Sequence, residues 1–131
     1  LLNGPKNGQA YKYILIDFWY TSCLPCIAEI PKLNEIAKVL NTRNDIVFIS
    51  INTDYVNGKK DEEFVKAFSK QHNIAFPVVY DNQQTSFNKQ LKVIGYPAKF
   101  IIDNQGSLIT KADNSAMTLL TFLDFIKNKA Q

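Results

Sequence analysis

Ten consecutive residues, Asp17-Phe18-Trp19-Tyr20-Thr21-Ser22-Cys23-Leu24-Pro25-Cys26, carry the most information in this chain. They join the end of an apolar, strand-like run to the start of a helical pattern, and they include the only two cysteines among 131 residues. A thiol at the start of a helix lies near unpaired backbone N–H groups, which favour thiolate over thiol. The thiolate is the reactive form, and a second thiol one turn later can attack a mixed disulfide formed by the first. This segment therefore predicts dithiol–disulfide exchange.

Strand-like and helical patterns alternate along the rest of the chain. Residues 13–19 and 46–51 are apolar on both faces, which is typical of central parallel strands. Helical spacing begins at Ile30, and Pro31 should kink that helix early because it removes one backbone hydrogen bond. The next predicted elements are a helix capped by Asp61, with Phe64, Val65 and Phe68 facing inward, and a short strand at 76–80. A modest helix with Phe87 and Leu91 follows, and then two strands at 98–102 and 107–111 that are joined by a turn. The last predicted element is a helix that begins at Ser115 and runs through Leu119, Phe122, Leu123 and Ile126.

This order of elements predicts the fold class. Strands that alternate with helices give an α/β fold with a mixed sheet covered by helices on both faces. The length suits one domain that spans residues 1–131. The chain starts at Leu1 without a methionine, and we expect it to be part of a longer protein.

Composition argues against nucleic-acid binding and against a membrane-spanning helix in this chain. The net charge is +3, and the basic residues are scattered and interleaved with acids rather than gathered in a phosphate-binding stripe. We therefore expect no nucleic-acid binding. No apolar stretch reaches the ~18 residues that a membrane-spanning helix needs.

Three motifs resemble the thioredoxin superfamily: Asp17-Phe18-Trp19, Cys23-Leu24-Pro25-Cys26 and Gly95-Tyr96-Pro97. The run Cys-x-Pro-Cys-x-x-Glu-x-Pro from Cys23 to Pro31, and an extra strand–helix pair between about residues 53 and 80, resemble its TlpA/ResA-like branch. The resemblance implies a thioredoxin fold with a strand–helix insertion. It also implies an extracytoplasmic thiol–disulfide oxidoreductase, periplasmic or tethered to a membrane and facing the periplasm. It further implies a reductase of protein disulfides that depends on an external electron donor and needs no cofactor or metal beyond its own cysteines.

The chain departs from the family at three positions. Ser22 stands where Trp is usual, and Leu24-Pro25 replaces the Gly-Pro dipeptide of thioredoxin itself. These two differences bear on substrate preference and reduction potential. Ser50 aligns where thioredoxins usually carry a Lys that faces the buried Asp, which argues against transferring the family's pKa argument to Asp17.

The two cysteines are expected to have different roles. Cys23, at the helix start and the more exposed, is the predicted attacking thiol, and Cys26, buried one turn later, resolves the mixed disulfide. One alternative is a structural disulfide, but so short a loop stabilises by only ~2 kcal/mol. Another is a zinc site, for which two cysteines and one histidine fall short of four ligands.

Two carboxylates are candidates for proton transfer. Asp17 lies within an apolar strand, and burying it is costly unless it is protonated or hydrogen-bonded. A raised pKa would let Asp17 relay a proton to or from Cys26, although a satisfied structural Asp is the alternative. Glu29 lies one turn after Cys26. The resemblance gives Glu29 a role in tuning the cysteines, whereas the plain alternative is a solvated side chain on the helix surface.

The remaining candidates concern substrate binding. The resemblance implies a cis Tyr96–Pro97 bond beside the first cysteine, where the Tyr96 backbone can pair with a substrate strand. Leu24 and Pro25 would border the same groove, and Trp19 either packs beneath the active-site loop or contacts substrate. His72, the one histidine, is expected to be structural.

The sequence therefore predicts a thiol–disulfide oxidoreductase that acts on disulfide-bearing or dithiol proteins. Two alternatives stay open. A thiol peroxidase would be expected to carry Thr three residues before the reactive cysteine, where this chain has Tyr20. A thioredoxin-like peptide-binding module would use the fold without the redox chemistry.

Overall fold

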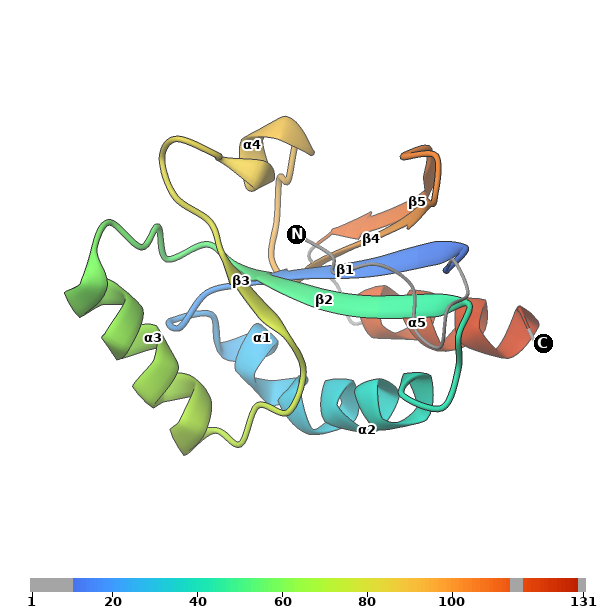
Figure 1. Ribbon diagram of the computed structural model, residues 1–131, viewed down its shortest axis with the longest axis horizontal. Helices are drawn as coiled ribbons and strands as arrows, with labels where there is room; N and C mark the ends of the chain where they lie inside the picture. Colours follow the sequence, from blue (N-terminus) through green and yellow to red (C-terminus); the bar gives the residue numbers. More distant parts are fainter. Residues whose placement is uncertain (1–10, 114–116, 130–131) are drawn as a thin grey trace.

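A five-stranded sheet in the order β3-β2-β1-β4-β5 organises the computed structural model, which describes residues 11–113 and 117–129 (Figure 1). The strands are β1 (Tyr13–Trp19), β2 (Ile46–Asn52), β3 (Val78–Tyr80), β4 (Ala98–Asp103) and β5 (Leu108–Asp113). The helices are α1 (Leu24–Ala28), α2 (Ile30–Leu40), α3 (Lys59–Gln71), α4 (Phe87–Gln90) and α5 (Met117–Asn128).

The sheet is mixed, as the order of elements predicted. β1 pairs in parallel with β2, and β2 pairs in parallel with β3. On its other side β1 is antiparallel to β4, and β4 and β5 form the predicted hairpin. The predicted insertion consists of α3 followed by β3, which adds the edge strand next to β2.

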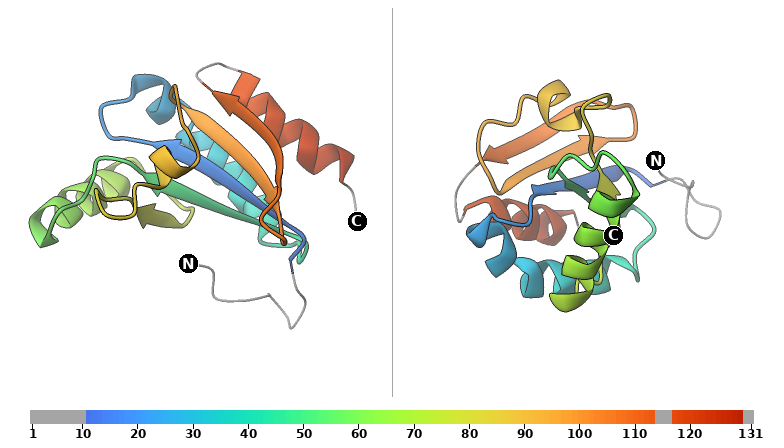
Figure 2. Two further views of the ribbon diagram at one scale, coloured as in Figure 1. Left: turned by 90° about the horizontal axis from the view of Figure 1, so that it is seen from above. Right: turned by 90° about the vertical axis from the view of Figure 1, so that its left-hand side faces the viewer.

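Helices cover both faces of the sheet, which confirms the predicted fold class. Leu15 on β1 packs in a core cluster with residues of α2 and α5, whereas Ile16 and Phe18 pack on the opposite face with residues of and around α4. Figures 1 and 2 show α1, α2 and α5 on one side of the sheet and α4 on the other. Because side chains alternate along a strand, Asp17 faces the same side as Leu15, toward the helix that follows the cysteines.

The helix after the cysteines is interrupted near the predicted position. It divides at Glu29 into α1 and α2, and Pro31 lies in the first turn of α2. Proline is tolerated there because backbone N–H groups in the first turn have no intrahelical partner. The break leaves Glu29 at the joint between the two helices.

Two details predicted for α3 are wrong. Gly58, not Asp61, is the N-cap residue, and Asp61 lies inside the first turn, where its carboxylate accepts a bond from Asn57 N at 3.3 Å. Phe64 is 60% exposed rather than inward, because the buried side of α3 is centred on Val65. At the other end of the chain, Phe122 of α5 is buried but Leu123 is 39% exposed, and Ser115 lies outside the described residues.

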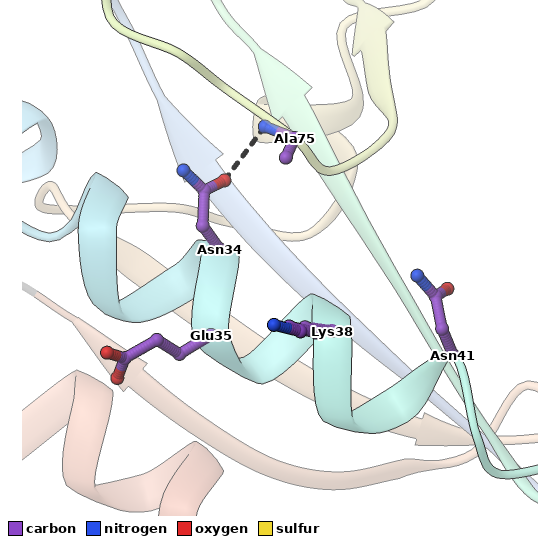
Figure 3. A pocket seen from close by; sticks show the side chains of 5 residues that line it. All are labelled: Asn34, Glu35, Lys38, Asn41 and Ala75. Carbon is purple, nitrogen blue, oxygen red and sulfur yellow. Dashed lines mark hydrogen bonds between the residues drawn. The ribbon is translucent and has the colours of Figure 1, made fainter.

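Asn34 of α2 holds the connection between α3 and β3. Its Nδ2 donates to Asn73 O at 2.8 Å. Its Oδ1 accepts from Ala75 N, also at 2.8 Å (Figure 3). Asn34 and Ala75 line a shallow surface pocket together with Glu35, Lys38 and Asn41. Within the described residues, the helices are too short or too polar to cross a lipid bilayer.

Candidate active site

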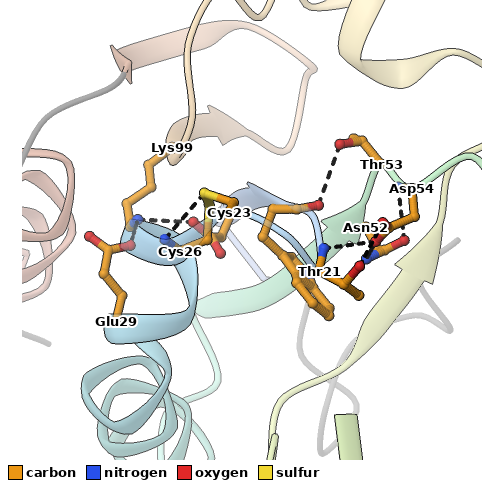
Figure 4. Close-up of a disulfide and its surroundings, with 10 residues drawn as sticks. Thr21, Cys23, Cys26, Glu29, Asn52, Thr53, Asp54 and Lys99 are labelled. Atoms are coloured by element: carbon orange, nitrogen blue, oxygen red, sulfur yellow. Dashed lines mark hydrogen bonds and ion pairs between the residues drawn. A yellow bond between two sulfur atoms is a disulfide. The ribbon is translucent and has the colours of Figure 1, made fainter. Parts of the chain in front are cut away.

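Cys23 and Cys26 form a disulfide between the carboxyl end of β1 and the start of α1, with the sulfurs 2.11 Å apart. Cys23 is the N-cap residue of α1, and its Sγ accepts a bond from Cys26 N at 3.2 Å (Figure 4). The chain enters this cap through a tight turn in which Cys23 N donates to Tyr20 O at 3.1 Å. The predicted placement of the first cysteine at a helix start is therefore confirmed.

Both cysteines are buried, each with 3% of its surface exposed. The expectation that Cys23 is the more exposed of the two is therefore wrong for the disulfide form. The reason is the packing around the pair: Trp19 and Val65 form one buried cluster with the cysteines, and Tyr20 and Tyr96 pack against that cluster. Leu24, between the cysteines, is 80% exposed, and Pro25 beside it is also exposed.

A buried lysine joins the two candidate carboxylates. Lys99 on β4 is in register with Asp17 on β1, and its Nζ lies 2.9 Å from Asp17 Oδ1 and 2.6 Å from Glu29 Oε1. The Lys99 side chain is fully buried, and that of Glu29 is only 12% exposed. Glu29 is therefore not a solvated surface residue, and Figure 4 shows it beside Lys99 next to the turn of α1 that carries Cys26.

Lys99 was not among the site residues predicted from the sequence. The available signal was its position as the one charge in the apolar run from Ala98 to Ile102, two residues after Pro97. That run predicts a buried strand, and a lysine buried in a strand requires a carboxylate partner. The partner could not be named because it depends on which strands become neighbours in the sheet.

Burial and the Asp17–Lys99 attraction shift the pKa values of Asp17 and Lys99 in opposite directions. Burial raises the pKa of Asp17 from 3.8 to about 6, although the Lys99 charge and hydrogen bond pull it down and the Glu29 charge adds to the rise. Burial disfavours the Lys99 ammonium, but the charges and hydrogen bonds of Asp17 and Glu29 outweigh that penalty and raise its pKa. The raised pKa expected for a buried Asp17 is thus present, and a cation accompanies it.

Ser50 stands opposite Asp17 on β2, at the position where the family usually carries the lysine. Its hydroxyl accepts a bond from Trp19 Nε1 at 3.3 Å and donates to Pro77 O at 2.9 Å. Trp19 is 3% exposed and packs against Phe68 of α3. This places Trp19 beneath the active-site turn, as the first of its two expected roles requires.

The Tyr96–Pro97 peptide bond is cis. The Tyr96 ring meets Tyr20 edge-on with centroids 4.9 Å apart, and its hydroxyl accepts from Asn88 Nδ2 at 3.4 Å. Asn88 Oδ1 in turn accepts from the Tyr55 hydroxyl at 2.8 Å. Tyr96 is therefore held from two sides next to the cysteine cluster.

The structure thus gathers most of the predicted residues. Cys23, Cys26, Trp19 and Tyr96 share one cluster, and Lys99 links Asp17 with Glu29. His72 is the C-cap residue of α3 and stacks on Phe68 at 4.2 Å. Within the described segments, no three His, Cys, Asp or Glu side chains converge as metal ligands.

Comparison with known proteins agrees with this geometry. The chain is 28% identical over 108 residues to the thioredoxin-like protein YneN of Bacillus subtilis, a match that covers 80% of this chain and 60% of YneN. It is 31% identical over 106 residues to the thiol-disulfide oxidoreductase ResA of Bacillus cereus, covering 76% of this chain and 54% of ResA. The ResA match confirms the resemblance to the TlpA/ResA-like branch. The chain spans little more than half the length of these two relatives.

A solved structure shows the same fold. The exposed lipoprotein thioredoxin Etrx1 of Streptococcus pneumoniae superposes with a TM-score of 0.73 at 23% identity, covering 95% of this chain and 96% of Etrx1. A family model described as thioredoxin-like matches residues 11–108, which include the cysteine pair, the Asp17–Lys99–Glu29 cluster and Pro97. This chain belongs to the thioredoxin-like family.

Proposed function

We propose that this protein is a thiol–disulfide oxidoreductase that reduces disulfides of protein substrates through Cys23 and Cys26. The observation that carries the proposal is the Cys23 cap, in which Sγ accepts from Cys26 N at the start of α1. In the reduced protein the same N–H would stabilise a thiolate on Cys23, since a hydrogen bond to an ionised acceptor is stronger than one to a neutral acceptor.

The reaction proceeds in two exchanges. The Cys23 thiolate attacks one sulfur of a substrate disulfide, so that a Cys23–substrate bond forms, the substrate S–S bond breaks, and the other substrate sulfur leaves as a thiolate that takes a proton. The Cys26 thiolate then attacks Cys23 Sγ, releases the second substrate sulfur and closes the Cys23–Cys26 disulfide. Two electrons have passed to the substrate, and an external dithiol donor returns the pair to its reduced form. The cysteines store the electrons, so the reaction needs no cofactor or metal.

Asp17, Glu29 and Lys99 supply the proton transfer in this proposal. Cys26 must lose its proton before it can attack, and a carboxylate with a pKa of about 6 is a suitable base near neutral pH. Lys99, whose Nζ lies 2.9 Å from Asp17 Oδ1, favours the ionised form of Asp17 and so opposes the effect of burial on its pKa.

Substrate binding involves the surface around the disulfide. The Tyr96–Pro97 segment would pair through its backbone with an extended substrate strand, beside the exposed Leu24 and Pro25. An extracytoplasmic location is supported by the similarity to Etrx1, which is named as an exposed lipoprotein.

The test is reduction of insulin by the reduced protein with an excess of small-molecule dithiol. We expect Cys23→Ser to abolish reduction. Reduced Cys26→Ser, freed of the small-molecule dithiol and then mixed with insulin, should accumulate a mixed disulfide through Cys23 that is detectable by intact mass. Thr42→Val, on the α2–β2 connection, is the matched control for handling and folding. Equal residual activity of the two cysteine variants would contradict the assigned roles.

One observation favours a second candidate, a thioredoxin-like peptide-binding module with a structural disulfide: both cysteines are buried. The two candidates differ in how the native disulfide responds to a reductant. An enzymatic disulfide opens in the folded protein within minutes of adding a dithiol, whereas a structural one opens only when the protein unfolds. Trapping free thiols with and without denaturant separates the two.

A further inference from the structure

Thr21 is bound through both of its donors to a single carboxylate. It lies two residues before Cys23, in the turn that leads from β1 to α1. Its backbone N–H donates to Asp54 Oδ2 at 2.9 Å, and its hydroxyl donates to Asp54 Oδ1 at 2.8 Å (Figure 4). Asp54 is 33 residues away in the sequence, just after β2. The two bonds fix both the position and the orientation of the turn.

Asp54 is itself held in place by the end of β2. Asn52 Nδ2 donates to Asp54 Oδ2 at 2.7 Å, and Asp54 N donates back to Asn52 Oδ1 at 3.1 Å. Asn52 is fully buried and in register with Trp19 on β1. Thr53 N adds a bond to Trp19 O at 2.9 Å, so the segment after β2 is tied to β1 directly before the turn. The Asp54 carboxylate is therefore held in place at the ends of β1 and β2, two neighbouring strands of the sheet.

The turn in question sets the geometry of Cys23. Cys23 N bonds to Tyr20 O, and the cap conformation of Cys23 directs Sγ to Cys26 N. A shift of the turn would move Sγ away from that N–H group. In Figure 4 the Thr21–Asp54 bonds lie on one side of the disulfide, and Lys99 and Glu29 lie on the other.

We infer that Thr21 and Asp54 are a positioning pair that sets the reactivity of Cys23 by anchoring the turn of residues 20–23 against the end of β2. This inference rests on the proposed function and extends it to two residues outside the cysteine motif. Neither side chain is hydrogen-bonded to a cysteine sulfur, and both act through the position that they give to Cys23 Sγ.

The position of Asp54 and its negative charge would change the reactivity of Cys23 in opposite directions, so the inference can be tested. A negative charge near a thiol raises the thiol pKa, so an Asp54 that acted only through its charge would make Cys23 less reactive. An Asp54 that acts by anchoring the turn makes Cys23 more reactive, because the Cys26 N–H can then stabilise the thiolate. Replacing Asp54 by a neutral side chain therefore gives opposite results under the two explanations.

The experiment measures the rate at which iodoacetamide alkylates Cys23 in the reduced full chain from about pH 5 to about pH 10, with peptide mass mapping to assign the adduct. Thr21→Val removes the hydroxyl donor without changing charge. We expect alkylation near pH 7 to be roughly 3- to 10-fold slower, with an unchanged rate at high pH, as for partial loss of a helix cap. Thr21→Ser keeps the hydroxyl and should restore the wild-type profile. Thr42→Val, which loses a hydroxyl bond to Val39 O far from the site, is the matched control.

Asp54→Asn completes the test, with thermal unfolding recorded for each variant to show that it is folded. We expect its alkylation midpoint to rise, as in Thr21→Val. A lower midpoint in Asp54→Asn, or wild-type profiles in both variants, would overturn the inference. Alkylation requires no protein substrate, so a wild-type protein that fails to reduce insulin while the variants shift the profile would refute the proposed function alone.

Discussion

Lys99 is the residue on which the charge balance of the buried site depends. Its ammonium lies 2.9 Å from the Asp17 carboxylate and 2.6 Å from the Glu29 carboxylate, and all three groups are largely shielded from water. With both carboxylates ionised the cluster carries one net negative charge, and with one proton added it is neutral. Removing one member of a buried ion pair is costly because the remaining charge loses its compensation.

We therefore predict a pH-dependent loss of stability in Lys99→Met. At neutral pH the free energy of unfolding should fall by roughly 3 kcal/mol, since two buried carboxylates lose their cation. At about pH 4 the loss should be much smaller, because Asp17, whose pKa burial raises to about 6, is then largely protonated and needs no cation. Urea denaturation of the oxidised protein at the two pH values measures both, with Lys60→Met on the exposed first turn of α3 as the control. A loss independent of pH would point to packing alone.

Asp17 gives a second prediction, in which the sign follows from its raised pKa. Between about pH 4 and about pH 6 the unfolded chain releases the Asp17 proton while the folded protein keeps it. The unfolded state then binds fewer protons, so the Asp17 contribution to stability is present at low pH and is lost as the pH rises to about 6. A shift from 3.8 to about 6 corresponds to on the order of 3 kcal/mol.

Asp17→Asn should remove this pH dependence. Over that interval the free energy of unfolding of the variant should decline with pH less than that of the wild type, and chemical denaturation at several pH values gives the comparison. Parallel curves for the two proteins would show that Asp17 titrates in the folded state as it does in the unfolded chain.

At the scale of elements, α4 shows how one side chain supports a helix too short to hold itself. A single turn of helix is unstable in isolation because nucleation costs more than its few hydrogen bonds return. Asp81, fully buried, accepts bonds from Phe87 N at 2.9 Å, Asn88 N at 3.1 Å and the Thr85 hydroxyl at 2.7 Å. These bonds fix the start of α4 and with it Asn88, which bonds to Tyr96.

We predict that Asp81→Ala loosens α4 and, through Asn88, the segment before Pro97. Loss of a buried acceptor with several donors should cost roughly 2–4 kcal/mol and increase amide exchange at residues 87–90. In the insulin assay KM should rise more than kcat falls, because the change affects substrate contact rather than the cysteines. Asp124→Ala, on the exposed side of α5, serves as the control. Unchanged exchange in α4 would show that packing alone holds this helix.

For the whole molecule, the relative stability of the oxidised and reduced forms determines the direction of the reaction. The Cys23–Cys26 link closes a very short loop, which in the chain-entropy model stabilises the oxidised protein by ~2 kcal/mol. A reductase is expected to be more stable when oxidised, so that its dithiol gives up electrons readily.

We therefore predict that the oxidised protein has the larger free energy of unfolding, by about 1–3 kcal/mol. Guanidinium denaturation of both forms, with the reduced form kept under excess dithiol, makes the comparison. A more stable reduced form would identify the protein as an oxidant of thiols and contradict the proposed direction.

The sequence by itself determined the features that depend on neighbours in the chain. The strand 13–19, the hairpin around residues 103–106 and the cysteine pair at a helix start follow from local periodicity, turn residues and spacing. The mixed sheet followed from the order of those elements. Local patterns did not give every detail: the sequence predicted Asp61 as the cap of α3, whereas the N-cap is Gly58, three residues earlier.

Only the tertiary structure decided which distant residues meet. Lys99 faces Asp17 because β4 lies antiparallel beside β1, and no pattern within either strand specifies that register. Thr21 meets Asp54 for the same reason, since the ends of β1 and β2 are adjacent only once the parallel pair has formed. The burial of Cys23 likewise comes from Trp19, Val65 and the tyrosines around it. Side-chain identity indicates which group needs a partner, but the packing of strands and helices supplies that partner.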